Sequence, residues 1–179
     1  MSFHSNIFIV PGLGNSGEGH WQTIWQNKYA FTRIQQQSWD KPIRTDWIQQ
    51  IDTVLNDYDY SNTILVGHSL ACNTIVQWAN VYRRNIKALL LVGPSDTESS
   101  SYPPGTTGFT PMPLYRLHFP SVVIASSNDF YVSTERALFF AEQWGSRFVN
   151  IGDAGHINVA AGFGEFEQGL VILRELDKL

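Results

Sequence analysis

Short runs of apolar residues alternate along the chain with longer segments in which apolar and polar residues are mixed. The short runs are rich in β-branched residues and end at glycine, proline or polar residues, which is typical of buried strands. The longer segments repeat their apolar residues at helical spacing, which is typical of helices that cover a sheet. This pattern predicts strands at residues 6–10, 33–36, 63–66, 87–92, 121–125 and 148–151. It predicts helices at residues 18–27, 45–55, 69–82, 133–141 and 164–176.

Strands and helices that alternate in this order favour an α/β fold with a mostly parallel sheet. Right-handed crossovers between parallel strands place helices on both faces of such a sheet. Its ligand-binding and catalytic residues lie at the carboxyl ends of the strands. A length of 179 residues without a linker or an internal repeat indicates one domain, 1–179. Residues 95–119 interrupt the alternation with a segment rich in serine, proline and glycine. Loops of this length without regular structure are usually functional or disordered.

Composition and charge exclude several kinds of partner. The net charge of −4 leaves no basic surface for nucleic acid or for anionic lipid. Cys72 is the single cysteine, so an intrachain disulfide and a thiolate metal cluster are excluded. No apolar stretch approaches the roughly 18 residues needed to span a bilayer. We therefore expect a cytoplasmic protein with no membrane segment.

Ser69 lies in the segment 66–71, with the sequence V-G-H-S-L-A, between a predicted strand and a predicted helix. A serine with small neighbours at a tight strand-to-helix turn is typical of a nucleophile elbow, where the backbone of the serine is strained. The start of a helix also directs backbone N–H groups toward developing negative charge. The segment predicts a nucleophile, and a serine that only caps the helix is the structural alternative.

A serine hydroxyl needs an adjacent base, and after a nucleophile elbow the expected chain order is serine, acid, histidine. His156 is the best candidate for the base, because it lies in a glycine-containing loop that follows the last predicted strand. The other histidines lie before Ser69 or directly before a strand.

Asp129 is the leading candidate for the acid, because it follows the predicted strand at 121–125. Asp96, which follows the strand at 87–92, is its rival, whereas Asp153 is too close in sequence to His156 to reach the far nitrogen of the ring. The role of such a carboxylate is to hold one imidazole tautomer and to stabilise the imidazolium that forms.

The turn after the first strand, P-G-L-G-N-S at 11–16, predicts part of an oxyanion hole. Two backbone N–H donors are needed, and Leu70, directly after the nucleophile, supplies one while Leu13 in the turn supplies the other. The turn lacks the lysine of a phosphate loop and the third glycine of a dinucleotide-binding motif. No cofactor and no metal are expected.

Several motifs are distributed from the first strand to the last loop. They are H-W-Q at 20–22, G-H-S-L at 67–70, F-T-P-M-P at 109–113, F-P-S at 119–121, A-S-S-N-D at 125–129, Y-V-S at 131–133 and G-H-I-N at 155–158. With the turn at 11–16, this set resembles the small serine hydrolases related to retinoblastoma-binding protein 9. The resemblance implies a compact, capless α/β-hydrolase with esterase- or peptidase-like activity and a triad at Ser69, Asp129 and His156.

Some positions depart from that resemblance. Ala71 and Phe130 stand where glycine and proline are expected, and His118 stands where proline is common. The family name suggests binding of a retinoblastoma-type pocket through L-x-C-x-E, but the single candidate, L-A-C-N-T at 70–74, ends in threonine. Binding of such a pocket protein is therefore not expected.

Aromatic and apolar residues near the predicted site suggest a substrate pocket. His20 and Trp21 follow the oxyanion turn, although Trp21 could equally belong to the core face of the first helix. The loop at 95–119 follows the strand next to the nucleophile strand, so it is expected to overhang Ser69 unless it is an Ω-loop packed on itself. It would supply an apolar wall made of Phe109, Met112 and Leu114.

Three functions fit the sequence. The first is a serine hydrolase that cleaves a small ester, thioester or amide through an acyl-enzyme on Ser69. The second is a binding protein on a catalytically weak hydrolase scaffold, and the third is a lyase or a cofactor-free perhydrolase. A complete set of triad and oxyanion candidates favours the first over the second, with a small-molecule acyl substrate, and does not discriminate against the third. The sequence identifies neither that substrate nor the oligomeric state.

Overall fold

The structure is a computed structural model that describes residues 3–179. It contains one six-stranded sheet in the order β2-β1-β3-β4-β5-β6, and all neighbouring strands are parallel. The predicted α/β fold with a parallel sheet is confirmed. The strands are β1 (Asn6–Val10), β2 (Thr32–Arg33), β3 (Thr63–His68), β4 (Ala88–Val92), β5 (Ser121–Ala125) and β6 (Arg147–Asn150).

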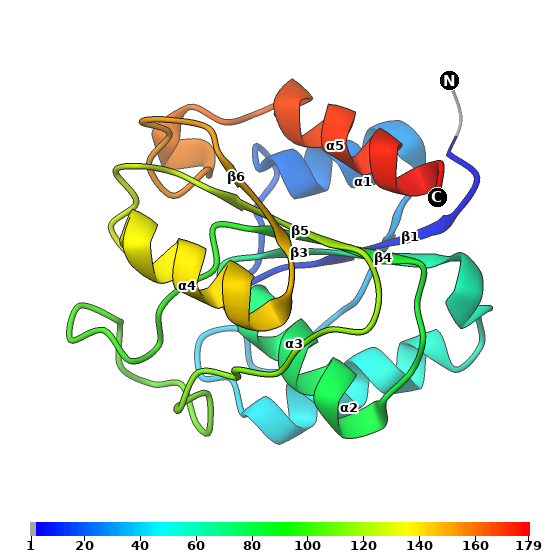
Figure 1. The fold of residues 1–179 in the computed structure, drawn as a ribbon, viewed down its shortest axis with the longest axis horizontal. Helices are drawn as coiled ribbons and strands as arrows, with labels where there is room; N and C mark the ends of the chain where they lie inside the picture. The colour runs from blue at the N-terminus through cyan, green and yellow to red at the C-terminus, as the bar shows by residue number, and fades with distance from the viewer. Residues whose placement is uncertain (1–2) are drawn as a thin grey trace.

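Five α-helices cover the two faces of the sheet (Figure 1). One face carries α1 (Trp21–Tyr29) and α5 (Glu167–Asp177); the other carries α2 (Arg44–Leu55), α3 (Leu70–Tyr82) and α4 (Thr134–Trp144). Successive strand residues point to opposite faces, so Ile64 packs into the cluster under α1 and α5 and Leu65 into the cluster under the other three helices. Two short 3₁₀ helices, Tyr60–Asn62 and Val159–Ala161, complete the regular structure. Within residues 3–179, no helix has the length and apolar character that a membrane crossing requires.

Several predicted boundaries are wrong for local reasons. The first helix begins at Trp21 rather than residue 18, because His20 is extended and its Nδ1 accepts a hydrogen bond from the Gln22 backbone N–H at 3.1 Å. The last helix begins at residue 167, because Phe166 adopts a positive φ of 46°. Strand β3 continues through His68, so the turn after it is confined to Ser69.

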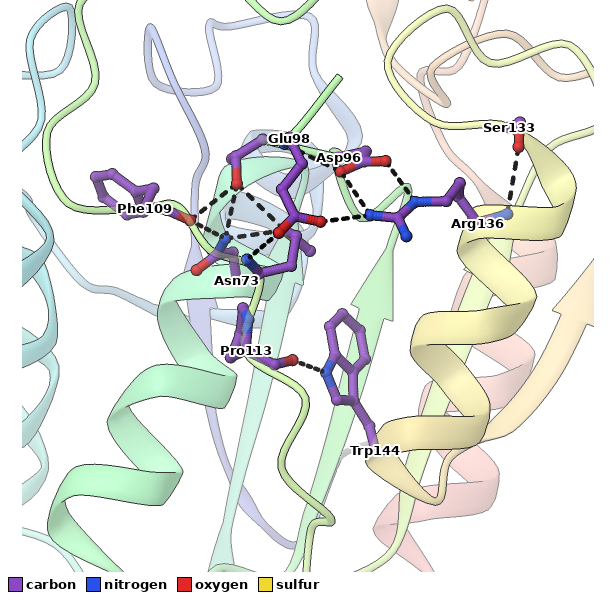
Figure 2. Close-up of polar contacts among 10 residues, drawn as sticks. Asn73, Asp96, Glu98, Phe109, Pro113, Ser133, Arg136 and Trp144 are labelled. Carbon is purple, nitrogen blue, oxygen red and sulfur yellow. Dashed lines mark hydrogen bonds and ion pairs between the residues drawn. The ribbon is translucent and has the colours of Figure 1, made fainter. Parts of the chain in front are cut away.

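The loop at 95–119 contains neither a helix nor a strand, as predicted, and polar contacts hold it against α3 and α4 (Figure 2). The Asn73 side-chain amide donates to the Phe109 carbonyl at 3.0 Å, and the Trp144 indole donates to the Pro113 carbonyl at 2.7 Å. Arg136 pairs with Asp96 at 2.6 Å. The loop is therefore fixed at its start, through Asp96, and in its second half, through Phe109 and Pro113.

Candidate active site

Ser69 occupies the turn between β3 and α3 with φ 59° and ψ −125°. Positive φ is strained for a residue with a side chain, and it is the backbone state that a nucleophile elbow imposes. The Ser69 N–H donates to the Val92 carbonyl at 3.0 Å, which ties the turn to the end of β4. Leu70 is the first residue of α3, so its N–H lies at the helix N-terminus, where backbone N–H groups are free to bind an anion.

The turn after β1 lies directly against the Ser69 turn. A Cβ atom on Gly12 would be 2.7 Å from the His68 carbonyl oxygen and 2.9 Å from the Ser69 Cβ. Both are closer than real Cβ contacts, so only glycine allows this approach. The contact places Leu13, the next residue, beside the nucleophile.

Asp129 and His156 form a hydrogen-bonded pair at the carboxyl ends of β5 and β6. Nδ1 of His156 lies 2.8 Å from Asp129 Oδ2 and 3.0 Å from Oδ1. The Asp129 side chain is fully buried, and its Oδ1 also accepts a hydrogen bond from the Tyr131 N–H at 2.9 Å. A carboxylate at Nδ1 selects the tautomer with its hydrogen there, so Nε2 carries a lone pair and can accept a proton.

The Ser69 hydroxyl contacts a second serine. Its Oγ lies 2.7 Å from the Oγ of Ser95, which follows β4 and is 1% exposed. Among the residues that the structure describes, Ser95 is the only hydrogen-bond partner of Ser69 Oγ, and Nε2 of His156 has no partner. Catalytic hydrogen bonds are often long in the absence of substrate and tighten in the substrate complex.

A cavity of about 170 Å³ brings these groups together. Of the predicted residues, Leu13, His20, Ser69 and His156 line it, whereas Asp129 lies behind His156. The loop at 95–119 contributes Tyr102 and Pro103 in addition to Ser95. Among the residues that the structure describes, no Asp, Glu, Lys or Arg side chain lines the cavity. Within residues 3–179, no cluster of His, Cys, Asp and Glu has the arrangement of a metal site.

The structure places the other predicted pocket residues elsewhere and so corrects the predicted apolar wall. Trp21 is fully buried between α1 and the sheet, and its indole donates to the Ile157 carbonyl at 2.8 Å. Phe109 packs against Trp47 and Leu70, and Met112 belongs to the main core. Leu114 is 46% exposed to solvent. The apolar residues of the loop anchor it to the protein, and other residues of the loop reach the cavity.

Asp96, the rival acid, has another role. Its carboxylate accepts hydrogen bonds from the Arg136 guanidinium at 2.6 and 3.2 Å, and Arg136 also pairs with Glu98 at 2.7 Å (Figure 2). The Asp96 N–H donates to the Tyr131 carbonyl at 2.9 Å. These contacts fix the residue directly after Ser95.

Sequence reasoning missed Ser95, Tyr102 and Tyr131 as residues of the site. Ser95 carried a usable signal, since it lies just beyond the carboxyl end of a strand that neighbours the nucleophile strand. Tyr102 and Tyr131 carried none, because their positions depend on loop conformation.

The sequence profile described as serine hydrolase matches residues 7–175. The chain belongs to this serine hydrolase family. A protein described as a YdeN-like hydrolase from Pectobacterium atrosepticum shares 30% identity and a TM-score of 0.86, over 97% of this chain and 90% of that one. The ydeN gene product of B. subtilis shares 18% identity and a TM-score of 0.82, over 97% and 98% of the two chains.

More distant structures share the fold alone. RedJ, a thioesterase of the prodiginine biosynthetic pathway in Streptomyces coelicolor, is 12% identical with a TM-score of 0.69, over 95% of this chain and 89% of that one. No curated protein matches the chain.

The segment 70–74 of this serine hydrolase lies in the first turns of α3. Leu70 and Cys72 are fully buried there, and burial raises the pKa of the Cys72 thiol. Neither side chain is available to a partner protein. The structure therefore gives no surface for L-x-C-x-E binding at this segment.

Two further histidines of the serine hydrolase lie near His156: the ring of His68 is next to that of His156, and the ring of His20 is next to that of His68. The ring centroids are 4.8 Å apart between His20 and His68 and 4.8 Å apart between His68 and His156. Burial, together with the charges of Arg33 and His156, lowers the pKa of His20 to about 4. Burial also holds the pKa of His68 well below its usual range. Both rings are therefore neutral at pH 7.

A buried neutral histidine makes the free energy of unfolding depend on pH. Between pH 6.5 and 4 the unfolded chain binds a proton at residue 20 and the folded protein does not, so stability present above pH 6.5 is lost as the pH falls. His20→Asn keeps a residue that caps helices well but does not titrate. The wild-type protein is expected to lose about 2 kcal/mol more than His20→Asn between pH 7 and pH 5. Urea unfolding at the two pH values measures this difference.

His4→Asn is the matched control, because His4 is exposed. This variant is expected to keep the wild-type dependence on pH. An equal loss of stability in wild type and His20→Asn would show that the folded protein protonates His20 as readily as the unfolded chain.

Proposed function

We propose that the protein hydrolyses a small ester, thioester or amide through an acyl-enzyme on Ser69. Ser69 is the nucleophile, His156 the general base and then the general acid, and Asp129 the residue that holds the His156 tautomer. The observation that carries the proposal is the buried Asp129–His156 pair, at 2.8 Å, beside the cavity that also contains Ser69.

In the proposed acylation step, His156 Nε2 takes the Ser69 proton while Ser69 Oγ bonds to the acyl carbon. The negative charge moves to the acyl oxygen, where the backbone N–H groups of Leu70 and Leu13 would stabilise it. His156 then returns the proton to the leaving group. In deacylation, water takes the place of Ser69 as the nucleophile, and His156 again acts first as base and then as acid, so that the carboxylic acid is released. The reaction requires no cofactor.

The cavity suggests the class of acyl group. A volume of about 170 Å³ accommodates a short chain, and a lining without ionised Asp, Glu, Lys or Arg favours a neutral one. We propose a carboxylesterase-like activity first and a peptidase-like activity second.

The family relationship and the location of the protein are further proposals. The motifs shared with the relatives of retinoblastoma-binding protein 9 support a close relationship to those hydrolases, and the single cysteine supports a cytoplasmic location.

Fluorophosphonate labelling tests the proposal, because these probes phosphonylate a serine only where a base activates it. The intact protein is expected to gain one phosphonyl group, and peptide mapping is expected to place it on Ser69. p-Nitrophenyl esters of increasing chain length, with aminoacyl-naphthylamides alongside, then measure the acyl preference. A folded protein that resists the probe and cleaves none of these substrates would contradict the proposal.

A further inference from the structure

Ser95 contacts the reacting oxygen of the proposed nucleophile. The two serine oxygens are 2.7 Å apart, which is the usual length of a hydroxyl–hydroxyl hydrogen bond. Ser95 lies two residues beyond Gly93, where an added Cβ would be 3.5 Å from Asp129 Oδ2 and 3.6 Å from the His156 ring. The end of β4 therefore packs against the Asp129–His156 pair and brings the Ser95 hydroxyl to Ser69.

The position of Ser95 is fixed from outside the cavity. The next residue, Asp96, is held by Arg136 of α4 at 2.6 Å (Figure 2). The Asp96 N–H also donates to the Tyr131 carbonyl at 2.9 Å. Ser95 itself is 1% exposed, and its Oγ has no other hydrogen-bond partner in the described part of the chain. A hydroxyl held this way has little freedom to turn toward solvent.

The two hydroxyl groups share one hydrogen bond, so one of them must be its donor. Nδ1 of His156 carries its hydrogen toward Asp129, so the proton acceptor at the site is Nε2. The Ser69 proton must go to Nε2 in the reaction, which leaves Ser95 to donate to Ser69 Oγ. Once Ser69 Oγ contacts Nε2 in the substrate complex, this assignment gives each hydroxyl hydrogen an acceptor, and a buried donor without one is costly.

The strength of this hydrogen bond changes during the reaction. The free Ser69 hydroxyl is a good acceptor, whereas the single-bonded oxygen of an ester is a poor one because its lone pair is delocalised into the carbonyl. The bond is therefore weakened when the acyl-enzyme forms and regained when the acyl-enzyme breaks down. Only an interaction that is stronger in the transition state than in the ground state accelerates a step.

We propose that Ser95 donates a hydrogen bond to Ser69 Oγ and thereby promotes deacylation. This inference rests on the proposed function. In deacylation, His156 Nε2 takes a proton from water and the water oxygen bonds to the acyl carbon. The bond from that carbon to Ser69 Oγ then breaks, its electron pair stays on Oγ, and the proton on Nε2 transfers to Oγ. Ser95 stabilises the negative charge that Oγ acquires before that transfer.

The test compares acylation and deacylation in wild type and Ser95→Ala. Stopped-flow hydrolysis of p-nitrophenyl acetate gives the acylation rate from the burst and the deacylation rate from the steady state. Ser95→Ala is expected to deacylate about tenfold more slowly and to acylate at close to the wild-type rate. Its kcat and KM then fall together while kcat/KM is kept, and mass spectrometry of the intact protein detects the accumulated acetyl-enzyme.

Three further variants separate the hydrogen bond from packing. Ser95→Thr keeps the hydroxyl and is expected to restore deacylation, and Ser95→Cys, a weak donor of similar size, is expected to be intermediate. Ser101→Ala removes an exposed hydroxyl of the same loop, bonded only within the loop, and is expected to behave as wild type.

Unchanged deacylation in Ser95→Ala, or an equal fall in acylation, would overturn the inference. If Ser95→Ala does not fold, Ser95→Cys replaces it in the test, and a wild-type deacylation rate in Ser95→Cys would likewise overturn the inference. A wild-type protein that the fluorophosphonate does not label refutes the proposed function instead, so the two failures are distinguishable.

Discussion

Replacing Ser69 with alanine is expected to lower kcat for p-nitrophenyl esters about 10⁶-fold and to abolish fluorophosphonate labelling. The variant lacks the oxygen on which we propose that the acyl-enzyme forms, so the proposed triad partners and oxyanion donors would have no covalent step to promote. The fold should persist, because the Ser69 side chain makes a single hydrogen bond and alanine has the same Cβ. Steady-state kinetics and circular dichroism of the same samples measure the two effects.

Ser101→Ala serves as the control, since it removes an exposed serine of the same protein. Its activity and labelling are expected to match wild type. If Ser69→Ala keeps more than a small fraction of kcat, the nucleophile is another group in the cavity. Ser95 is then the first to examine, since its hydroxyl is 2.7 Å away.

Replacing Asp129 with asparagine is expected to lower kcat about 10⁴-fold while the protein stays folded. The carboxylate accepts a hydrogen from Nδ1 of His156, but the side-chain amide of asparagine can present its NH₂ group there. The ring then carries its hydrogen on Nε2, which can no longer accept the Ser69 proton. Kinetics at several pH values above neutrality measure the loss.

Asp153→Asn is the matched control for Asp129→Asn, because Asp153 is an exposed carboxylate in the loop of His156. It is expected to keep wild-type activity. Asp96→Asn removes the negative charge that pairs with Arg136, so we expect it to reduce stability more than catalysis. A larger catalytic loss in Asp96→Asn than in Asp129→Asn would reverse the assignment of the acid.

The strand ends could be predicted from the sequence because they follow from local chemistry. Buried strands are readable as apolar runs, and a parallel sheet gathers their carboxyl ends at one edge. Ser69 follows such a run directly, whereas Asp129 and His156 lie in the loops after β5 and β6. Their location at one edge of the sheet could therefore be predicted, but their hydrogen bond depends on loop conformation. The same reasoning could have identified Ser95, which follows β4, but the sequence prediction did not include that residue.

The cavity wall could not be predicted, because the composition of the loop at 95–119 does not determine which of its side chains point into the cavity and which into the core. Phe109 and Met112 look like wall residues by their apolar character, but that same character buries them against α2 and α3. Tyr102 and Pro103 reach the cavity because of where the anchored loop turns. The predicted start of α1 was wrong for a related reason, since the helix cap that His20 provides depends on one hydrogen bond.

In this loop, the residues that attach it to the protein are largely different from the residues that line the cavity. Phe109, Pro113 and Asp96 attach the loop to the helices, and Tyr102 packs against Trp47, Leu70 and Phe109 as well as lining the cavity. Among the described residues of the loop, Pro103 lines the cavity without belonging to a core cluster. Substitutions at 103 can therefore alter the acyl preference while leaving the reacting groups in place, and this position offers a starting point for laboratory evolution.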